Sequence, residues 1–195
     1  MTELVWYVAY GSNLSRARLQ EYLDRGPDPS PPRDDRPLTI GHPLFFAEES
    51  LTWGGGRAYV DHAVAVPAVT MARAWLLTRS QWDDLHAQES GPDHGAGTDP
   101  TSLADGETRI VGGGRYDVLL GLGRRGGVPV VTFTGPERLD SATCTRPAPE
   151  YLRRIATGLH EAHGLTVVDA ITYLLDRPGV ADCWTGEELA AALRA

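Results

Sequence analysis

The sequence predicts an α+β fold, a small mixed or antiparallel β-barrel with flanking helices, in a single domain covering residues 1–195. Segments that resemble strands dominate the first two thirds of the chain, and amphipathic helical patterns dominate its end. Most connections between the strand segments are too short for crossover helices, so the sheet cannot be parallel throughout. A chain of 195 residues is long enough for one domain with a sizeable core.

The first element, residues 5–14, predicts a strand, a tight turn and a helix. Gly11 lets the backbone bend or lets a ligand approach closely. Either Ser12 or Asn13 would cap the helix that follows, whose inner face carries Leu19, Tyr22 and Leu23. The first N–H groups of such a helix form an anion or oxygen site. The alternative interpretation is an ordinary capped turn.

Further strands are predicted in the middle of the chain. They cover residues 38–47, 58–60, 63–66, 70–78, 115–122 and 128–133. Residues 70–78 are largely apolar, which favours a central strand, and the last two segments predict a hairpin. Residues 93–114 are rich in Gly, Asp, Thr and Ser, which predicts a long loop.

Four further helices have recognisable start signals. Ser80 and Asp83 predict a capping box, and Gly91 would end that helix. The longest helix begins near Glu150 and would stop at Gly164. Thr166 with Asp169, and Thr185 with Glu188, predict capping boxes for the last two helices.

Glu89 is the candidate for acid–base chemistry. Trp82, Leu85 and Glu89 share one helix face, and the two apolar residues would point into the core. A carboxylate beside them would lie at the core or in a cleft, where its pKa tends to be raised. The alternative is a solvated Glu89 at the frayed end of the helix.

Composition and charge indicate which classes of protein the chain could belong to. The net charge is −8 and every basic residue is Arg, without the clusters typical of a nucleic-acid surface. We expect a cytoplasmic protein, since two distant cysteines suggest no disulfide scaffold and no apolar run could span a membrane. His160 and His163 are expected at the surface rather than at a metal.

Three stretches together resemble the gamma-glutamylcyclotransferase family. The first is Tyr10-Gly11-Ser12-Asn13-Leu14 after an N-terminal strand, and the second runs from residue 74 to Glu89. The third, residues 148–151, leads into the long helix, and the turn at residues 53–56 is also similar. The matches extend from residue 4 to about residue 176. Two departures are Phe133, where the family often has tyrosine, and a longer loop at residues 93–114, which could be a lid.

The resemblance implies a closed barrel and an activity that needs no metal or cofactor. The amine of a γ-glutamyl group would attack its own γ-carbonyl, which releases 5-oxoproline and an amine or amino acid. Glu89 would be catalytic, and Tyr151 would bind substrate. The family's other substrate-binding positions correspond to Tyr7, Val8, Ala9, Tyr10, Gly11, Ser12 and Asn13.

The partner implied is a small γ-glutamyl compound, with neither nucleic acid nor membrane, and a homodimer is one option for assembly. Three alternatives stay open. The pocket could hydrolyse an amide as a deacylase does, the leaving amine could belong to a larger metabolite, or the protein could be a non-catalytic binding module.

Overall fold

The computed structural model describes residues 3–91, 99–112 and 114–194. Its contacts divide the chain into two compact units, each built from three separate stretches. Unit 1 comprises residues 1–9, 19–38 and 73–136, and unit 2 comprises residues 10–18, 39–72 and 137–195.

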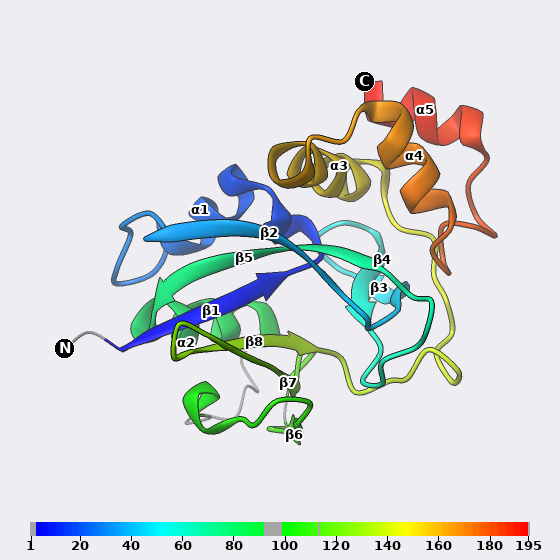
Figure 1. Cartoon of the computed structure of the whole chain (residues 1–195). Coiled ribbons are helices and arrows are strands. Elements are labelled where there is room, and N and C mark those ends of the chain that lie inside the picture. The colour runs from blue at the N-terminus through cyan, green and yellow to red at the C-terminus, as the bar shows by residue number, and fades with distance from the viewer. Residues whose placement is uncertain (1–2, 92–98, 113, 195) are drawn as a thin grey trace. The chain divides into compact units, whose positions relative to one another are not determined.

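Unit 1 is built on a six-stranded sheet (Figure 1). Its strands are β1 Leu4–Ala9, β2 Asp34–Ile40, β5 Thr70–Thr78, β6 Thr108–Ile110, β7 Val118–Arg125 and β8 Val128–Thr134. The order across the sheet is β2-β5-β1-β8-β7-β6, and β2 and β5 each continue past the boundary of the unit. Strand β1 is antiparallel to β5 and parallel to β8, so the sheet is mixed.

The sequence of β1 explains its central place. Every residue from Val5 to Ala9 is buried, which is typical of a strand with both faces covered. Helix α2, Arg79–Ser90, contacts β1. In helix α1, Arg16–Leu23, the predicted inner residues Leu19, Tyr22 and Leu23 are buried.

The sheet is open, so the expected closed barrel is wrong. Within the described residues, β2 and β6 form the two edges of the sheet. Two strands that could have extended it, β3 Leu44–Ser50 and β4 Gly55–Val60, pair instead with each other in a separate sheet. The α+β class itself is confirmed.

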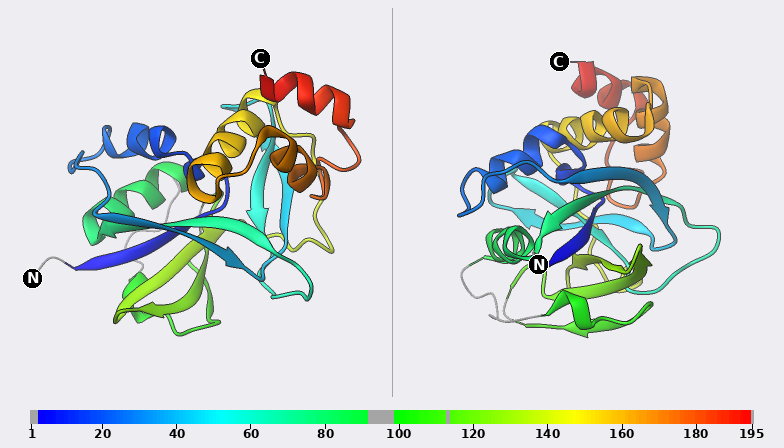
Figure 2. Two further views of the ribbon diagram at one scale, coloured as in Figure 1. Left: turned by 45° about the horizontal axis from the view of Figure 1, so that its top comes forward. Right: turned by 60° about the vertical axis from the view of Figure 1, so that its left-hand side comes forward.

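Unit 2 combines the β3–β4 hairpin with three helices, which appear in yellow to red in Figure 2. The helices are α3 Pro149–His163, α4 Val167–Leu175 and α5 Gly186–Arg194. The hairpin has a bulge where Glu48 takes a φ of +49°. The N–H of Phe46 donates to the Pro178 carbonyl, and its own carbonyl accepts from Thr145, which ties β3 to segments near the helices.

Several predicted elements are confirmed within the described residues. These are the strand at 70–78, the hairpin of β7 and β8, the Gly164 stop, and the capping pairs Thr166–Asp169 and Thr185–Glu188.

Other predicted elements differ from the structure. Residues 63–66 lie in a loop, Thr78 rather than Ser80 caps α2, and α1 begins only at Arg16, after a 3-10 turn η1 at Ser12–Leu14. The expected loop 93–114 contains a 3-10 turn η2 at Pro100–Ser102 and strand β6, while its residues 93–98 and 113 lie outside the described residues.

None of the helices in the described part of the chain is both long and apolar enough to cross a membrane.

Candidate functional site

The predicted site residues are divided between the two units at the Ala9–Tyr10 peptide bond. Tyr7, Val8, Ala9 and Glu89 belong to unit 1. Tyr10, Gly11, Ser12, Asn13 and Tyr151 belong to unit 2.

In unit 1, the end of β1 is held rigidly by β8. The Tyr7 ring stacks on Phe133 with 5.0 Å between centroids and an interplanar angle of 17°. The Val8 carbonyl accepts a hydrogen bond from the Thr132 hydroxyl at 2.7 Å. Ala9 is 1% exposed, so its side chain has almost no accessible surface.

Phe133, where the resemblance leads us to expect tyrosine, lies inside a row of rings. His86 stacks against it at 5.0 Å, and Trp82 lies 5.1 Å beyond His86. The Nε2 atom of His86 lies 2.8 Å from the Tyr116 carbonyl oxygen. Because a carbonyl only accepts, Nε2 carries the proton in this contact.

Glu89 lies one residue before the end of α2 and is half-buried. Trp82 and Leu85 are buried at 1% and 0% exposure, as their spacing predicted. The helix end is held by the following segment: Arg115 Nε donates to the Glu89 carbonyl at 3.3 Å, and the Ser90 hydroxyl donates to the Tyr116 carbonyl at 3.1 Å. The guanidinium also places a positive charge at the negative end of the helix dipole.

In unit 2, two stretches far apart in the sequence meet at Gly11. Tyr151 follows Pro149 in the first turn of α3, and it is 4% exposed. Its hydroxyl accepts the Ala58 N–H at 3.2 Å and would lie 3.0 Å from a Cβ placed on Gly11. The two motifs that the resemblance joins are therefore in contact.

The turn after Gly11 is closed by its own backbone. The Leu14 N–H donates to the Gly11 carbonyl at 3.0 Å, and the Ser15 N–H donates to the Ser12 carbonyl at 3.1 Å. Ser12 and Asn13 are both buried. Neither caps α1, because they form the 3-10 turn themselves.

Trp53, which lies beside Tyr151, and Arg18, which lies beside Trp53, received no role from the sequence. The Trp53 ring lies 5.4 Å from the Tyr151 ring, and Arg18 Cζ lies 5.3 Å from the centroid of Trp53. Trp53 belongs to the turn that resembles the family. Arg18 carries no local signal, since it is one of many arginines and its partner is distant in the chain.

The two histidines on α3 each form a hydrogen bond with a main-chain carbonyl group. His160 Nδ1 and His163 Nε2 each lie 2.9 Å from a carbonyl oxygen, of Leu165 and Ala72 respectively. Across residues 3–91, 99–112 and 114–194, no group of three or more His, Cys, Asp and Glu residues could hold a metal ion.

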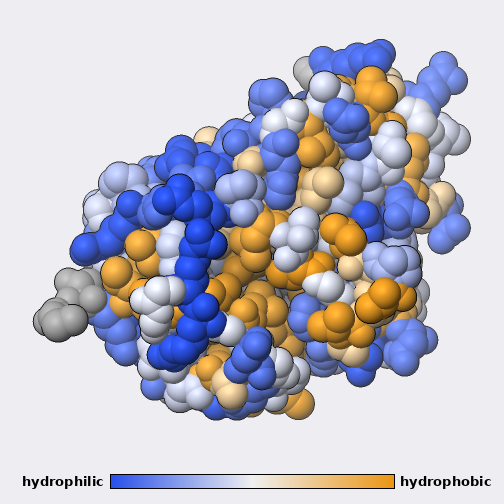
Figure 3. Space-filling model, in the orientation of Figure 1, coloured by the Kyte–Doolittle hydropathy of each residue, from blue (hydrophilic) through white to orange (hydrophobic). Residues whose placement is uncertain are grey.

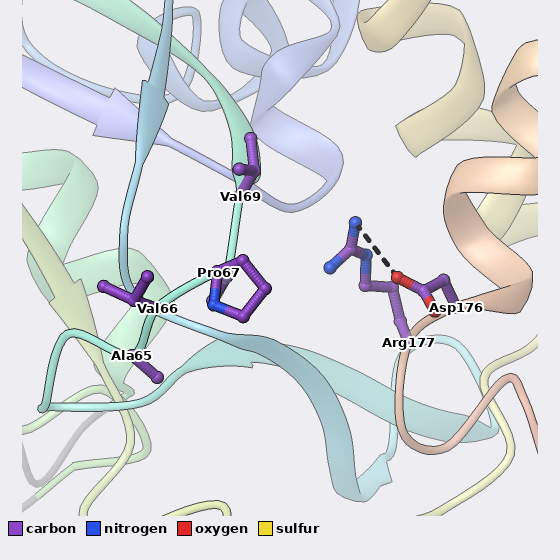
Figure 4. Close-up of a pocket in the computed structure, with 7 residues that line it drawn as sticks. Ala65, Val66, Pro67, Val69, Asp176 and Arg177 are labelled. Carbon is purple, nitrogen blue, oxygen red and sulfur yellow. Dashed lines mark ion pairs between the residues drawn. The ribbon is translucent and has the colours of Figure 1, made fainter.

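Unit 2 also has a hollow of about 390 Å³ that contains none of the predicted site residues. One wall is residues 65–69 and the other is Asp176 and Arg177, which form an ion pair at 3.9 Å (Figure 4). Hydrophobic side chains reach the molecular surface among hydrophilic ones (Figure 3), and Val66 beside this hollow is 93% exposed. Apart from this ion pair, the side chains that line the hollow in the described part of the chain are apolar.

Comparison with known proteins first gives a distant sequence relative. No family model matches the chain. The chain is 27% identical over 198 residues to histone deacetylase 5 of Arabidopsis thaliana, a match that covers 87% of this chain and 30% of the plant protein. The chain thus spans less than a third of that relative's length.

Solved structures give a likeness over nearly the whole chain. A gamma-glutamyl cyclotransferase superposes with a TM-score of 0.59 and 18% identity, covering 98% of this chain and 99% of that one. The chain has the gamma-glutamyl cyclotransferase fold. An uncharacterized human protein superposes with a TM-score of 0.56 and 19% identity, covering 99% of both chains. These matches confirm the predicted resemblance at the level of the fold.

Proposed function

We propose that the protein cleaves a γ-glutamyl amide by intramolecular cyclisation, which releases 5-oxoproline and a free amine or amino acid. The observation that carries this proposal is the contact between Tyr151 and Gly11, within the gamma-glutamyl cyclotransferase fold. The resemblance gives both positions a substrate-binding role, and the fold brings them together although they lie far apart in the sequence.

The reaction joins two groups of one substrate molecule. The α-nitrogen forms a bond to the γ-carbonyl carbon, and the bond from that carbon to the leaving nitrogen then breaks. Since nucleophile and electrophile share one molecule, folding the substrate into a reactive shape supplies much of the rate.

Glu89 is the proposed acid–base group. The attacking amine is an ammonium in water and must lose a proton, which the Glu89 carboxylate accepts. That proton then passes to the leaving nitrogen. The attacking nitrogen loses a second proton as the new C–N bond forms, and the carboxylate passes this proton to the departing amine, so the lactam is neutral and the carboxylate is regenerated. The hydrogen bonds at the end of α2 support this role because they hold the Glu89 backbone in one position.

The turn at Gly11 is the proposed oxygen site. Backbone N–H groups near Tyr10, Gly11 and Ser12 hold the developing oxyanion or the substrate carboxylate. The Tyr151 hydroxyl accepts the Ala58 N–H, and it donates its own proton to a substrate oxygen in this proposal.

The test is incubation of the protein with a panel of γ-glutamyl amino acids and amines, with 5-oxoproline measured by mass spectrometry. Glu89→Gln should lower turnover by about 10²-fold or more. Asp83→Asn is the matched control, because Asp83 is an exposed acid on the same helix. Full turnover in Glu89→Gln would exclude Glu89 as the base, and no product from the unmodified protein would exclude the reaction.

Hydrolysis is the second candidate, favoured by the name of the plant relative, a histone deacetylase, since deacetylation also cleaves an amide. Water would then replace the internal amine as the nucleophile. Free glutamate without 5-oxoproline would identify hydrolysis of γ-glutamyl substrates, and acetate released from an acetyl-lysine peptide would identify deacetylation. Binding of a γ-glutamyl compound with no product would identify a binding module.

A further inference from the structure

We propose that Arg18 binds a carboxylate of the substrate and that Trp53, which lies beside Tyr151, holds the Arg18 guanidinium in position. The identity of the substrate rests on the proposed function. The binding event itself can be measured without turnover.

Four residues of unit 2 form a continuous series of contacts. Arg18 Cζ lies 5.3 Å from the Trp53 ring centroid, inside the range of about 6 Å for a cation–π interaction. The Trp53 ring lies 5.4 Å from the ring of Tyr151, whose hydroxyl lies against Gly11. The series leads from a positive charge to the proposed oxygen site.

Three of the four residues in this series are partly exposed. Tyr151 is 4% exposed, whereas Arg18, Trp53 and Gly11 are each partly exposed. Solvent therefore reaches part of Arg18, Trp53 and Gly11, whereas Tyr151 between Trp53 and Gly11 is buried.

The chemistry of a guanidinium selects a carboxylate. Its N–H groups point outward in the plane of the group and match the two oxygens of a carboxylate. The whole chain carries a net charge of −8, so an anionic ligand needs a local cation at its binding site. Arg18 supplies that cation, and Trp53 and Tyr151 connect it to the proposed oxygen site.

A γ-glutamyl amino acid offers two carboxylates. One is the α-carboxylate of the γ-glutamyl group, and the other belongs to the amino acid that leaves. Both would make the same contact with a guanidinium, and ligands that lack one or the other distinguish them.

Titration calorimetry would measure Kd in the Glu89→Gln background, which keeps substrates intact, with and without Arg18→Gln. The ligand γ-glutamyl-alanine has both carboxylates. In γ-glutamyl-ethylamide the leaving group has none, and 4-aminobutanoyl-alanine lacks the α-carboxylate. Arg18→Gln should weaken binding of γ-glutamyl-alanine by about 10- to 100-fold.

The ligand that Arg18→Gln leaves unaffected identifies the carboxylate. Unchanged binding of γ-glutamyl-ethylamide assigns Arg18 to the leaving amino acid, and unchanged binding of 4-aminobutanoyl-alanine assigns it to the α-carboxylate. The proposal is overturned if Arg18→Gln binds γ-glutamyl-alanine as tightly as its parent, if it weakens all three ligands equally, or if the parent binds none of them.

Trp53 is a positioning residue, and its variants test that role. Trp53→Phe keeps a ring under the guanidinium and should bind γ-glutamyl-alanine within about threefold of its parent, whereas Trp53→Leu should lose about tenfold. Equal binding by both variants would remove Trp53 from the proposal.

Control measurements show whether a weaker Kd comes from lost ligand recognition or from a less stable fold, and whether binding occurs without turnover. Arg16→Gln, an exposed arginine on the same helix, should change neither Kd nor melting temperature. Arg18→Lys keeps the charge but loses the planar fork, so it should bind with intermediate affinity. If the unmodified protein makes no 5-oxoproline yet binds carboxylates through Arg18, the proposed reaction fails and this site stands.

Discussion

Gly11 occupies a position where any side chain would touch the proposed site. A Cβ there would lie 3.0 Å from the Tyr151 hydroxyl and 3.3 Å from Ala58 Cβ. Its φ is −105°, outside the left-handed region that favours glycine, and its ψ is −144°. The close approach of α3 and β4 therefore gives a reason for glycine at this position that does not depend on a left-handed turn.

Gly11→Ala should therefore destabilise the protein by about 1–3 kcal/mol through crowding and should weaken substrate binding. Chemical denaturation and the titrations described above would measure both effects. Gly186→Ala is the control, because a Cβ placed there would lie 3.6 Å from the Leu175 side chain, an ordinary contact, and alanine is accepted in a helix. Equal stability of the two variants would mean that the Tyr151 hydroxyl moves aside at no cost.

The burial of a single residue could be predicted from the sequence where the neighbours that decide it are close to it in the chain. Trp82 and Leu85 are buried as expected because positions three apart share a helix face. Arg18 was not predictable, since its place is set by contact with Trp53, a residue from another element. Whether Glu89 is catalytic stays a prediction.

At the scale of elements, one main-chain carbonyl group outside α2 holds the last turn of that helix in place. The Tyr116 carbonyl accepts hydrogen bonds from both His86 and Ser90, which lie on either side of Glu89. This double contact fixes the last turn of the helix against the segment that leads into β7.

His86→Phe keeps a ring between Trp82 and Phe133 but removes the donor to Tyr116. We expect a loss of about 1–2 kcal/mol in the free energy of unfolding. Amide hydrogen exchange should accelerate at residues 87–91, which report the helix end. Unchanged exchange there would show that Ser90 alone holds the turn.

The start of α2 shows why helix boundaries were misplaced. Ser80 followed by Asp83 has the sequence of a capping box, but Thr78 and Gln81 form the real one, at 3.0 and 3.2 Å. Thr78 is the last residue of β5 and has extended backbone angles, so the helix begins where the strand ends. The Gln81 side chain also donates to the Ser30 carbonyl, a distant contact that local patterns do not contain.

At the scale of the whole molecule, stability should depend on acid pH through Asp61, which is 5% exposed. Burial alone would raise the pKa of Asp61, but hydrogen bonds from the Ala63 and Leu139 N–H groups and from Arg138 outweigh it, so the pKa lies below its usual 3.8. A lowered folded pKa means that the stabilisation is present above about pH 4 and is lost as the pH falls through the folded value.

Asp61→Asn should cost about 1–2 kcal/mol at pH 6, because a charged acceptor of three hydrogen bonds is lost. Urea unfolding at pH 6 and pH 3 should show this difference shrinking at the lower pH. Asp140→Asn, at an exposed position nearby, should match the unmodified protein at both values. A constant difference between pH 6 and pH 3 would contradict the role of the carboxylate charge.

The fold class was predictable because it follows from the order of strand and helix patterns, and the solved structures confirm it. Whether the barrel closes could not be predicted, because closure depends on which strands share hydrogen bonds. Strands β3 and β4 pair with each other instead of joining the large sheet. The large sheet ends, within the described residues, at the three-residue strand β6. Those pairings are set by long-range contacts that period-two patterns do not contain.

The place of β1 in the sheet has a consequence during synthesis of the chain. This apolar strand leaves the ribosome before the other strands of the sheet, and its parallel neighbour β8 begins only at Val128. At about 5–20 residues per second, β1 waits roughly 6–25 seconds for that partner. During this interval the edge of β1 that pairs with β8 is open to chaperones and to other nascent chains, so the yield of folded protein should be sensitive to translation speed and chaperone supply.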